Sequence, residues 1–360
     1  MGKAISVDDH SPSVVSVARA LPRHHVSQAT LTAAFRDHWT AAHFNRARLD
    51  ELHRAVGVEG RYLALPLEAY PALDTFAKAN AAWVDAAADL GEQALQAALR
   101  QAGLVPGELD HLFFVTVTGI ATPSVDALLS NRLGLRSDLK RTPIFGLGCV
   151  AGAAALARAS DTLRAFPDQT AAVLSVELCS LTLQRGDLSL SNIIASGLFG
   201  DGAAAVVLQG AQRAAAGPRV VATRSVFYPH TERVMGWDLV DGGFKVLLSP
   251  EVPALAKAHI GGDVDGFLGS LGLKRSDMQH WIAHTGGPKV LQAFEEALAL
   301  PAGALERSWE SLRTVGNLSS ASVLFVLGDL LEAGVAKAGD RGLLLAMGPG
   351  FCAELVLLEW

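Results

Sequence analysis

The sequence predicts an α/β protein made of two similar halves. Apolar runs of strand length alternate with longer runs of helical periodicity along the whole chain, a pattern typical of this class. With 360 residues, of which 50% are hydrophobic, the chain can bury one large core or two ordinary ones. In each half a reactive residue follows an expected strand and precedes an expected helix, which suggests a duplicated unit. We expect the division into residues 1–212 and 213–360, at a linker near 210–217.

In the first half, short apolar runs predict strands at 14–21, 111–118, 142–147, 170–177 and 203–208. Helices are expected between them, at 27–39, 75–102, 124–133 and 153–164. Ser27 is placed to cap the first of these helices. The long helix carries Phe76, Trp83 and Leu90 at helical spacing, which core packing explains without a cofactor.

In the second half, the same reasoning predicts strands at 220–228, 244–248, 281–283, 342–347 and 353–359. Residues 229–243 are polar and irregular, so we expect a surface loop there. Helices are expected after Pro253, over 321–333, and from Pro288, because proline suits the first turn of a helix.

The composition excludes several classes of protein. The net charge of −6, with no long block of Lys and Arg, argues against nucleic acid as a partner. Cys149, Cys179 and Cys352 are too few and too scattered for a disulfide framework or a zinc site, so we expect no metal and a reducing, cytoplasmic compartment. Residues 1–14 lack the pattern of a signal peptide, and no apolar run reaches the ~18–20 residues of a membrane span. The mean hydropathy of +0.29 instead indicates a heavily buried protein with an apolar subunit interface.

The most informative stretch is 142–152, where an apolar run ends in Gly146 and Gly148 and Cys149 follows. Glycines allow a strand to turn sharply into a helix. Cys149 would then lie at a helix N-terminus, which lowers the pKa of a thiol and favours the nucleophilic thiolate. A lone cysteine is more often a buried core residue, but the flanking glycines favour an activated nucleophile.

A thiol nucleophile needs a partner that stabilises its thiolate. His284 is the best candidate, because it follows an expected strand and precedes a Gly-Gly-Pro turn from which a side chain can project into a cleft. Asn317 follows Gly316 just before a helix, as an ordinary N-cap or as an amide donor aimed at a developing oxyanion. Neither His284 nor Asn317 is persuasive alone. Because Cys149, His284 and Asn317 all occupy strand-to-helix turns, together they favour a functional site.

Four arginines surround the helical segment at 45–62 and form either a solvated face or a cluster that steers an anionic, phosphate-bearing substrate: Arg46, Arg48, Arg54 and Arg61.

These motifs together resemble the type III polyketide synthases, the chalcone-synthase-like branch of the thiolase fold. The matching segments follow in order along nearly the whole chain: the glycine-flanked Cys149, 198–205, 284–288, 316–321 and 348–351. The resemblance implies a thiolase-like αβαβα layered fold of two similar halves, and a homodimer. The runs 235–238 and 243–249 look most like those of bacterial members that make alkylresorcinols and alkylpyrones.

The resemblance also implies a condensing enzyme that uses free CoA thioesters and no other cofactor. Cys149 would pair with His284 as a thiolate, attack a starter acyl-CoA and hold the acyl group. Malonyl-CoA would lose CO2, and His284 and Asn317 would stabilise the enolate through its thioester oxygen. Attack on the acyl-cysteine, repeated and followed by ring closure, would give an alkylpyrone or alkylresorcinol.

Further residues are assigned by the resemblance alone. Phe199 matches an apolar wall between the CoA tunnel and the cavity, although simple core packing also explains it. Arg54 and Lys289 fall near the entrance for the CoA phosphates. Val117, Cys179 and Val246 differ in residue type from the matching positions of plant members, and these differences favour an aliphatic starter. The positions that match the substrate cavity are Val117, Thr118, Cys179, Thr182, Val246, Ser319, Gly350 and Phe351.

Other interpretations stay open. The initiating β-ketoacyl-ACP synthase shares the fold and a Cys-His-Asn set, but the runs 317–321 and 348–351 favour the polyketide branch. The glycines at 146–152 could belong to an NAD(P)-binding oxidoreductase, which needs an acidic residue ~20 positions beyond; Glu177 lies too far on. A catalytically inactive scaffold of the same fold is disfavoured, because Cys149, His284 and Asn317 are all present.

Overall fold

The computed structural model describes residues 10–40, 46–213 and 216–360. The expectations for residues 1–9, and for 214–215 of the linker, lie outside the described residues. The strands are β1 (Ser13–Ala20), β2 (His24–Ser27), β3 (Gly60–Leu63), β4 (His111–Thr116), β5 (Lys140–Phe145), β6 (Thr170–Leu178), β7 (Asp201–Gln209), β8 (Arg219–Phe227), β9 (Met235–Val240), β10 (Gly243–Leu248), β11 (His280–Ala283), β12 (Arg341–Gly348) and β13 (Cys352–Glu359). The α-helices are α1 (Gln28–Thr40), α2 (Arg46–Ala55), α3 (Phe76–Gln101), α4 (Val125–Leu133), α5 (Ala151–Ala165), α6 (Leu190–Leu198), α7 (Val252–Ser270), α8 (Pro288–Leu298), α9 (Glu306–Val315) and α10 (Ser322–Ala333).

The main sheet is mixed and has the strand order β11-β12-β13-β8-β1-β7-β6-β4-β5. Its two arms repeat one pairing scheme. In one arm β4 is parallel to β6, β6 is antiparallel to β7, and β7 is antiparallel to β1. In the other arm β11 is parallel to β12, β12 is antiparallel to β13, and β13 is antiparallel to β8. The arms meet where Ser13 of β1 pairs with Arg219 of β8. The topology therefore shows the duplicated unit that the positions of the reactive residues suggested.

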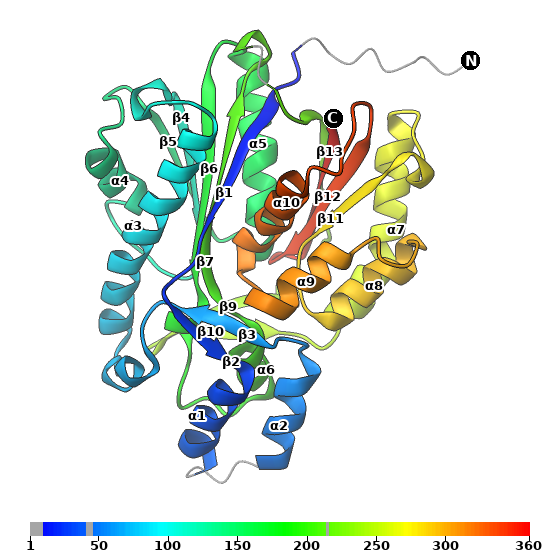
Figure 1. The fold of residues 1–360 in the computed structure, drawn as a ribbon. Helices are drawn as coiled ribbons and strands as arrows, with labels where there is room; N and C mark the ends of the chain where they lie inside the picture. The colour runs from blue at the N-terminus through cyan, green and yellow to red at the C-terminus, as the bar shows by residue number, and fades with distance from the viewer. Residues whose placement is uncertain (1–9, 41–45, 214–215) are drawn as a thin grey trace.

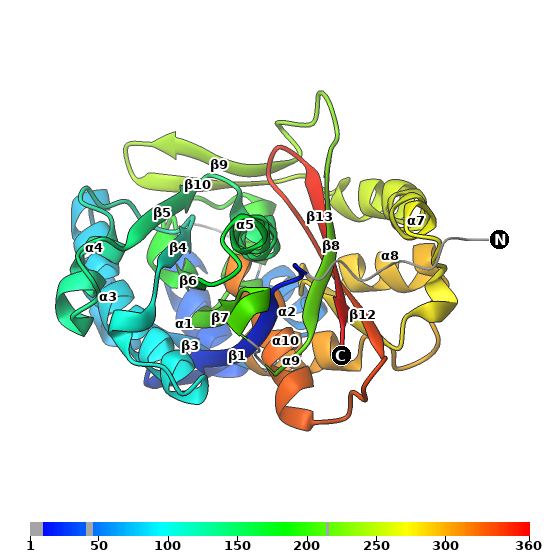
Figure 2. The same ribbon diagram turned by 90° about the horizontal axis from the view of Figure 1, so that it is seen from above.

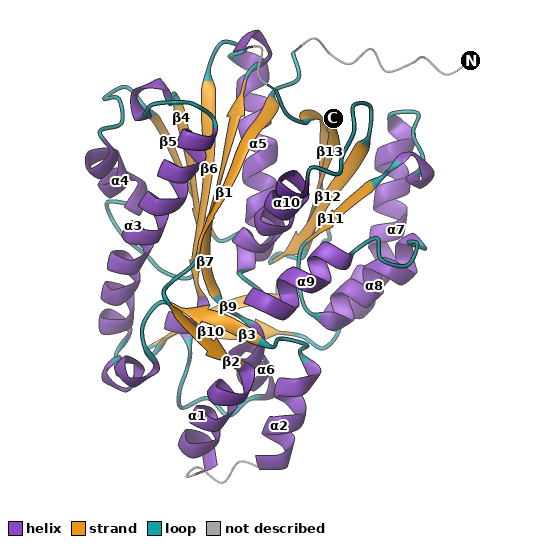
Figure 3. Cartoon of the chain, viewed as in Figure 1, coloured by secondary structure: helices purple, strands orange, loops and turns teal. Residues whose placement is uncertain are grey.

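The helices form three layers around the two arms. In Figure 1, α3 and α4 cover the outer face of one arm, α7 and α8 cover that of the other, and α5 and α10 lie between them. Figure 3 shows the same alternation of helix and strand layers, and the view from above places α5 between β6 and β13 (Figure 2). This is the predicted αβαβα arrangement.

Small side chains allow the two inner helices to pack closely. Ala153 and Leu156 of α5 share one buried core with Leu324 of α10 and with strands of both arms. A Cβ at Gly152 would lie 2.1 Å from the carbonyl oxygen of Ser320, so only glycine fits there. This contact brings the turn that carries Cys149 close to the segment that follows Asn317.

A cap lies beneath the layers and is built from α1, α2, α6, the β2–β3 pair and the β9–β10 hairpin (Figure 1). The sequence prediction of a loop over residues 229–243 is partly wrong, because β9 pairs antiparallel with β10 from Met235 to Val240. Its run of Gly236, Trp237 and Asp238 lacks the apolar alternation of a half-buried strand, so the strand gave no clear signal. Within the described ranges, no helix is both long enough and apolar enough to cross a membrane.

Candidate active site

Cys149 lies in a 3₁₀ turn, Gly148–Val150, between the end of β5 and the start of α5. The expected strand therefore ends earlier than predicted, and a short turn precedes the helix. Gly146 and Gly148 have φ values of 95° and 55°, which favour glycine. A Cβ at Gly148 would also lie 2.6 Å from ring atoms of Pro349. This close approach of the loop that contains Gly350 and Phe351 leaves the Cys149 side chain only 8% exposed.

His284 directly follows β11, where its backbone N–H donates to the Leu345 carbonyl of β12 (3.0 Å). Pro288 then opens α8 at the first helical position, as predicted. Both imidazole nitrogens are buried, and neither has a hydrogen-bond partner among the described residues. His284 lines the same cavity as Cys149 and Asn317, so its ring can serve a bound molecule.

Asn317 is not the N-cap of a helix, since Leu318 precedes the 3₁₀ turn Ser319–Ala321 and Ala321 precedes α10 in that position. The Asn317 side-chain oxygen accepts hydrogen bonds from the Ser319 N–H (2.8 Å) and from the Ser322 hydroxyl (3.3 Å). Because these bonds occupy the oxygen, the amide N–H groups are the part left for the cavity. The side-chain oxygen therefore stabilises the turn before α10, and the amide N–H groups stay available as donors.

Burial dominates the electrostatics of the two reactive groups. It raises the pKa of the Cys149 thiol to about 12, and the nearby Glu177 raises that pKa as well. Hydrogen bonding from the Ser319 hydroxyl, at 3.7 Å, and from Asn317 acts in the opposite direction. Burial also lowers the pKa of His284 to about 4. The lowering of the thiol pKa expected from the helix N-terminus is thus outweighed by desolvation, and the cavity holds a neutral thiol and a neutral imidazole.

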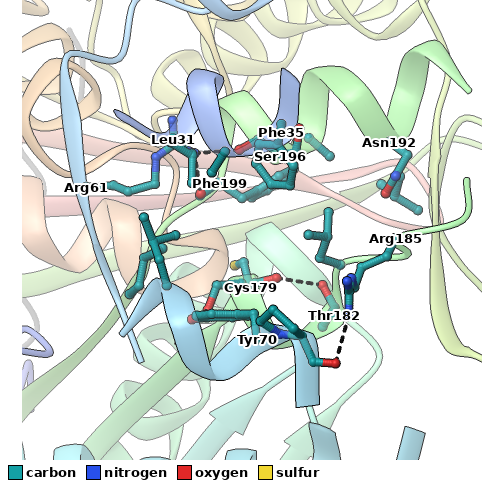
Figure 4. A pocket seen from close by; sticks show the side chains of 18 of the residues that line it. Leu31, Phe35, Arg61, Tyr70, Cys179, Thr182, Arg185, Asn192, Ser196 and Phe199 are labelled. Carbon is teal, nitrogen blue, oxygen red and sulfur yellow. Dashed lines mark hydrogen bonds between the residues drawn. The ribbon is translucent and has the colours of Figure 1, made fainter. Parts of the chain in front are cut away.

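A second, largely apolar compartment adjoins the catalytic cavity. The catalytic cavity has a volume of about 60 Å³ and the compartment about 200 Å³. Residues that line both and form the wall between them are Cys179, Phe199, Trp237 and Val246. Beyond this wall the compartment runs toward α1, where Leu31 and Phe35 line it (Figure 4).

The remaining residues assigned by resemblance fall in several places. Thr182 lines the compartment and not the catalytic cavity. Thr118 is buried and lines neither of these two spaces; its hydroxyl donates to Glu177 Oε2 (2.9 Å). Gly350, with a φ of 71°, shapes the turn next to Phe351. Those that line the catalytic cavity are Val117, Cys179, Phe199, Val246, Ser319 and Phe351.

Arg54 and Lys289 are both exposed and lie outside the catalytic cavity. Their segments are neighbours, since a Cβ at Gly57 would lie 3.3 Å from the Pro288 ring. The structure therefore places these two cations on adjoining segments at the surface. Arg48 and Arg54 of the arginine cluster are exposed, but Arg61 is only 1% exposed and belongs to β3, so the expectation of a solvated face is wrong for Arg61.

Sequence reasoning missed Glu177 as a component of the site. This carboxylate lies on the last residue but one of β6, is fully buried, and accepts hydrogen bonds from the Val117 N–H (3.1 Å) and from the hydroxyls of Thr118 and Ser320. Burial raises its pKa to about 7. One acidic residue inside an otherwise apolar strand was the available signal, because acidic side chains are rarely buried without partners.

The fold and this cavity define a thiolase-like condensing enzyme. Models of the chalcone and stilbene synthases match almost the whole chain, the N-terminal domain at residues 4–212 and the C-terminal domain at 219–359. The chain thus belongs to the chalcone and stilbene synthase family and is a type III polyketide synthase, a malonyl-CoA-dependent condensing enzyme. This confirms the predicted family over the carrier-protein-dependent synthase and the oxidoreductase.

Relatives and solved structures agree with this assignment. The 1,3,6,8-tetrahydroxynaphthalene synthase of Streptomyces peucetius subsp. caesius is 51% identical over 363 aligned residues, which span 100% of this chain and 96% of the relative. The crystal structure of 1,3,6,8-tetrahydroxynaphthalene synthase from Streptomyces coelicolor A3(2), a bacterial type III polyketide synthase, has a TM-score of 0.92 at 32% identity and covers 97% of this chain and 99% of its own. Germicidin synthase from Streptomyces coelicolor has a TM-score of 0.89 at 27% identity and covers 98% of this chain and 100% of its own.

Proposed function

We propose that this enzyme condenses malonyl-CoA units on Cys149 and cyclises the chain to a polyhydroxylated naphthalene of the 1,3,6,8-tetrahydroxynaphthalene type. The observation that carries the catalytic part is that Cys149, His284 and Asn317 line one buried cavity. The product class is supported by 51% identity, over the whole chain, to a relative named for that product. Hydroxyl groups on alternate ring carbons are the pattern left when malonyl-derived units join head to tail.

Loading begins with transfer of a proton from the Cys149 thiol to His284. Because burial disfavours each lone charge, thiolate and imidazolium form as a pair in which each compensates the other. The sulfur attacks the thioester carbonyl of the acyl-CoA and the carbon–sulfur bond to CoA breaks. The departing CoA thiolate takes the proton from the imidazolium.

Extension follows when malonyl-CoA loses CO2 and the bonding electrons of the broken carbon–carbon bond become an enolate. The N–H groups of His284 and Asn317 donate to its thioester oxygen, where the negative charge develops. The enolate carbon attacks the acyl-cysteine and expels the Cys149 thiolate, so the lengthened chain leaves on CoA. Its return to Cys149 starts the next round.

A second candidate function is favoured by the apolar compartment of about 200 Å³ beside the cavity. A fatty acyl starter on Cys149 would place its hydrocarbon tail there, and an alkylpyrone or alkylresorcinol would result. Substitution of Val246 in the shared wall by phenylalanine narrows the passage. We expect Val246→Phe to lower kcat/KM for long acyl-CoA starters about tenfold and to affect malonyl-CoA alone much less.

Mass spectrometry of the products tests both functions. The purified enzyme is given malonyl-CoA alone and, separately, malonyl-CoA with acetyl-, hexanoyl- or palmitoyl-CoA, without any carrier protein. A hydroxylated naphthalene from malonyl-CoA alone supports the first proposal. Alkylpyrones only in the presence of a fatty acyl-CoA, with no product from malonyl-CoA alone, would replace it by the second.

We also propose that the enzyme is a cytoplasmic homodimer joined along β5. This strand is the edge of the sheet and almost all of its residues are exposed. Phe145 and Leu147 are 53% and 37% exposed just before the Cys149 turn, and an unpaired edge with exposed apolar side chains favours pairing with another chain. Light scattering should show a dimer, and Phe145→Glu should shift it to a monomer. A monomeric unsubstituted enzyme would contradict this.

A further inference from the structure

Arg61 is buried beside the catalytic cavity and holds the end of one helix. Its Nη1 donates to the carbonyl oxygens of Ser196 (2.9 Å) and Phe199 (2.8 Å), and its Nη2 donates to the Gly197 carbonyl and to the side-chain oxygen of Gln28. The three carbonyls all belong to the C-terminal end of α6. Figure 4 shows Arg61 at one edge of the apolar compartment, next to Phe199.

This contact has a clear electrostatic origin. The C-terminus of a helix leaves carbonyl groups without partners and carries a partial negative charge. The guanidinium supplies both the missing donors and the opposite charge. No carboxylate in the described part of the chain forms an ion pair with Arg61. Burial lowers the pKa of Arg61 to about 9, which leaves it charged at neutral pH. The nearby Asp201 carboxylate raises that pKa, so the cation is compensated by this carboxylate together with the carbonyl groups to which it donates.

The segment that Arg61 holds also positions Asn317. The Asn317 N–H donates to the Leu198 carbonyl (2.9 Å), and the Gly200 N–H donates to the Asn317 carbonyl (3.0 Å). The segments around Leu198 and Asn317 are in close contact, since a Cβ at Gly316 would lie 2.7 Å from the Leu198 oxygen. Phe199, between these bonds, lines the catalytic cavity. A shift of the α6 terminus must therefore move both the Phe199 wall and the Asn317 amide.

We propose that Arg61 is a positioning residue for the condensation step, which acts through the end of α6 on Phe199 and Asn317. The inference rests on the role proposed above for Asn317 in stabilising the enolate. Cys149 belongs to the separate turn between β5 and α5. The hydrogen bond of Asn317 is only the smallest influence on the pKa of Cys149, so Arg61 should matter far more for malonyl-CoA decarboxylation and condensation than for loading of the thiol.

The test compares Arg61→Lys with a matched control, Arg164→Lys. Lysine keeps the charge but loses the planar fork that reaches several carbonyls at once. Arg164 also donates to two main-chain carbonyls, Val220 (2.8 Å) and Val221 (2.7 Å), at the end of α5 remote from Cys149. For each variant two quantities are measured: the rate of acyl transfer from hexanoyl-CoA to Cys149, and kcat/KM for malonyl-CoA.

Arg61→Lys should lower kcat/KM for malonyl-CoA ~10- to 100-fold, as expected for misplacement of a catalytic group by about 1 Å, with acyl loading within about twofold of the unsubstituted enzyme. Arg164→Lys should change neither rate. If Arg61→Lys does not yield folded protein, Gln28→Leu takes its place, because it removes one hydrogen-bond partner of the guanidinium. This variant should lower kcat/KM for malonyl-CoA about threefold and leave the rate of acyl loading nearly unchanged.

Equal losses of loading and condensation, or unchanged condensation, would overturn the positioning role. An unsubstituted enzyme that acylates Cys149 with neither hexanoyl-CoA nor malonyl-CoA would overturn the proposed function itself, and the inference with it.

Discussion

The hydroxyl of Ser319 lies 3.7 Å from the sulfur of Cys149, on a residue whose φ of +49° is in the left-handed region. That conformation costs a non-glycine residue ~1–3 kcal/mol. The Ser319 N–H is held by the side-chain oxygen of Asn317 (2.8 Å). One strained residue therefore connects the thiol to the amide that we propose stabilises the enolate.

Replacement of Ser319 separates these two effects. The Ser319 hydroxyl lowers the pKa of Cys149. Ser319→Ala removes this hydroxyl and should raise that pKa, so alkylation of the thiol by iodoacetamide near pH 8 should slow several-fold. Ser319→Gly also lacks the hydroxyl but tolerates the positive φ. We therefore expect the glycine variant to exceed the alanine variant by ~1 kcal/mol in free energy of unfolding. Equal unfolding free energies would contradict the strain, and unchanged alkylation would contradict the hydrogen bond.

Glu177 should make stability depend on pH. Burial raises its pKa from 4.5 to about 7, so the folded protein binds this proton more tightly than the unfolded chain. The resulting stabilisation is complete below about pH 4.5 and is lost as the pH rises through about 7. Glu177→Gln stays neutral, so its melting temperature relative to the unsubstituted enzyme should rise between about pH 5 and pH 8.

The same substitution tests the effect of Glu177 on the thiol. The carboxylate raises the pKa of Cys149, so alkylation near pH 8 should be faster in Glu177→Gln. For the stability prediction, a difference in melting temperature between Glu177→Gln and the unsubstituted enzyme that stays constant from about pH 5 to pH 8 would show that the Glu177 carboxyl has an ordinary pKa.

Asn317→Ala should lower the rate of malonyl-CoA decarboxylation ~10²- to 10³-fold, because it removes donors aimed at the developing oxyanion. A suitable control is Asn80→Ala. The Asn80 amide also bonds main chain, at the N–H and carbonyl of Ile120 (2.8 Å each), but at the surface. Release of CO2 measured at saturating malonyl-CoA should fall only in the first variant. A loss below about tenfold would leave Asn317 only the structural role of bonding the turn before α10.

Local signals in the sequence located much of this architecture. The glycines around Cys149 and the proline after His284 act through backbone geometry, so they predicted the turns from neighbouring residues alone. The repeated alternation of strands and helices likewise predicted the fold class and its two halves.

What the sequence did not show depends on tertiary burial. Arg61 is hydrophilic and follows the exposed Arg48 and Arg54 in the sequence, yet the end of α6, more than a hundred residues away, supplies its partners. The high pKa of Cys149 reverses the expected effect of the helix N-terminus, because desolvation depends on what surrounds the thiol in space. Strand β9 escaped detection since its pairing with β10, and not its own pattern, defines it.

The most direct test of the central claim is peptide mass spectrometry of the enzyme after brief mixing with an acyl-CoA. We predict one acyl adduct, on Cys149, and none on Cys179 or Cys352. Cys149→Ala should form no adduct and no polyketide, yet still release CO2 from malonyl-CoA through His284 and Asn317. An adduct on another residue, or normal product formation by the alanine variant, would contradict the account.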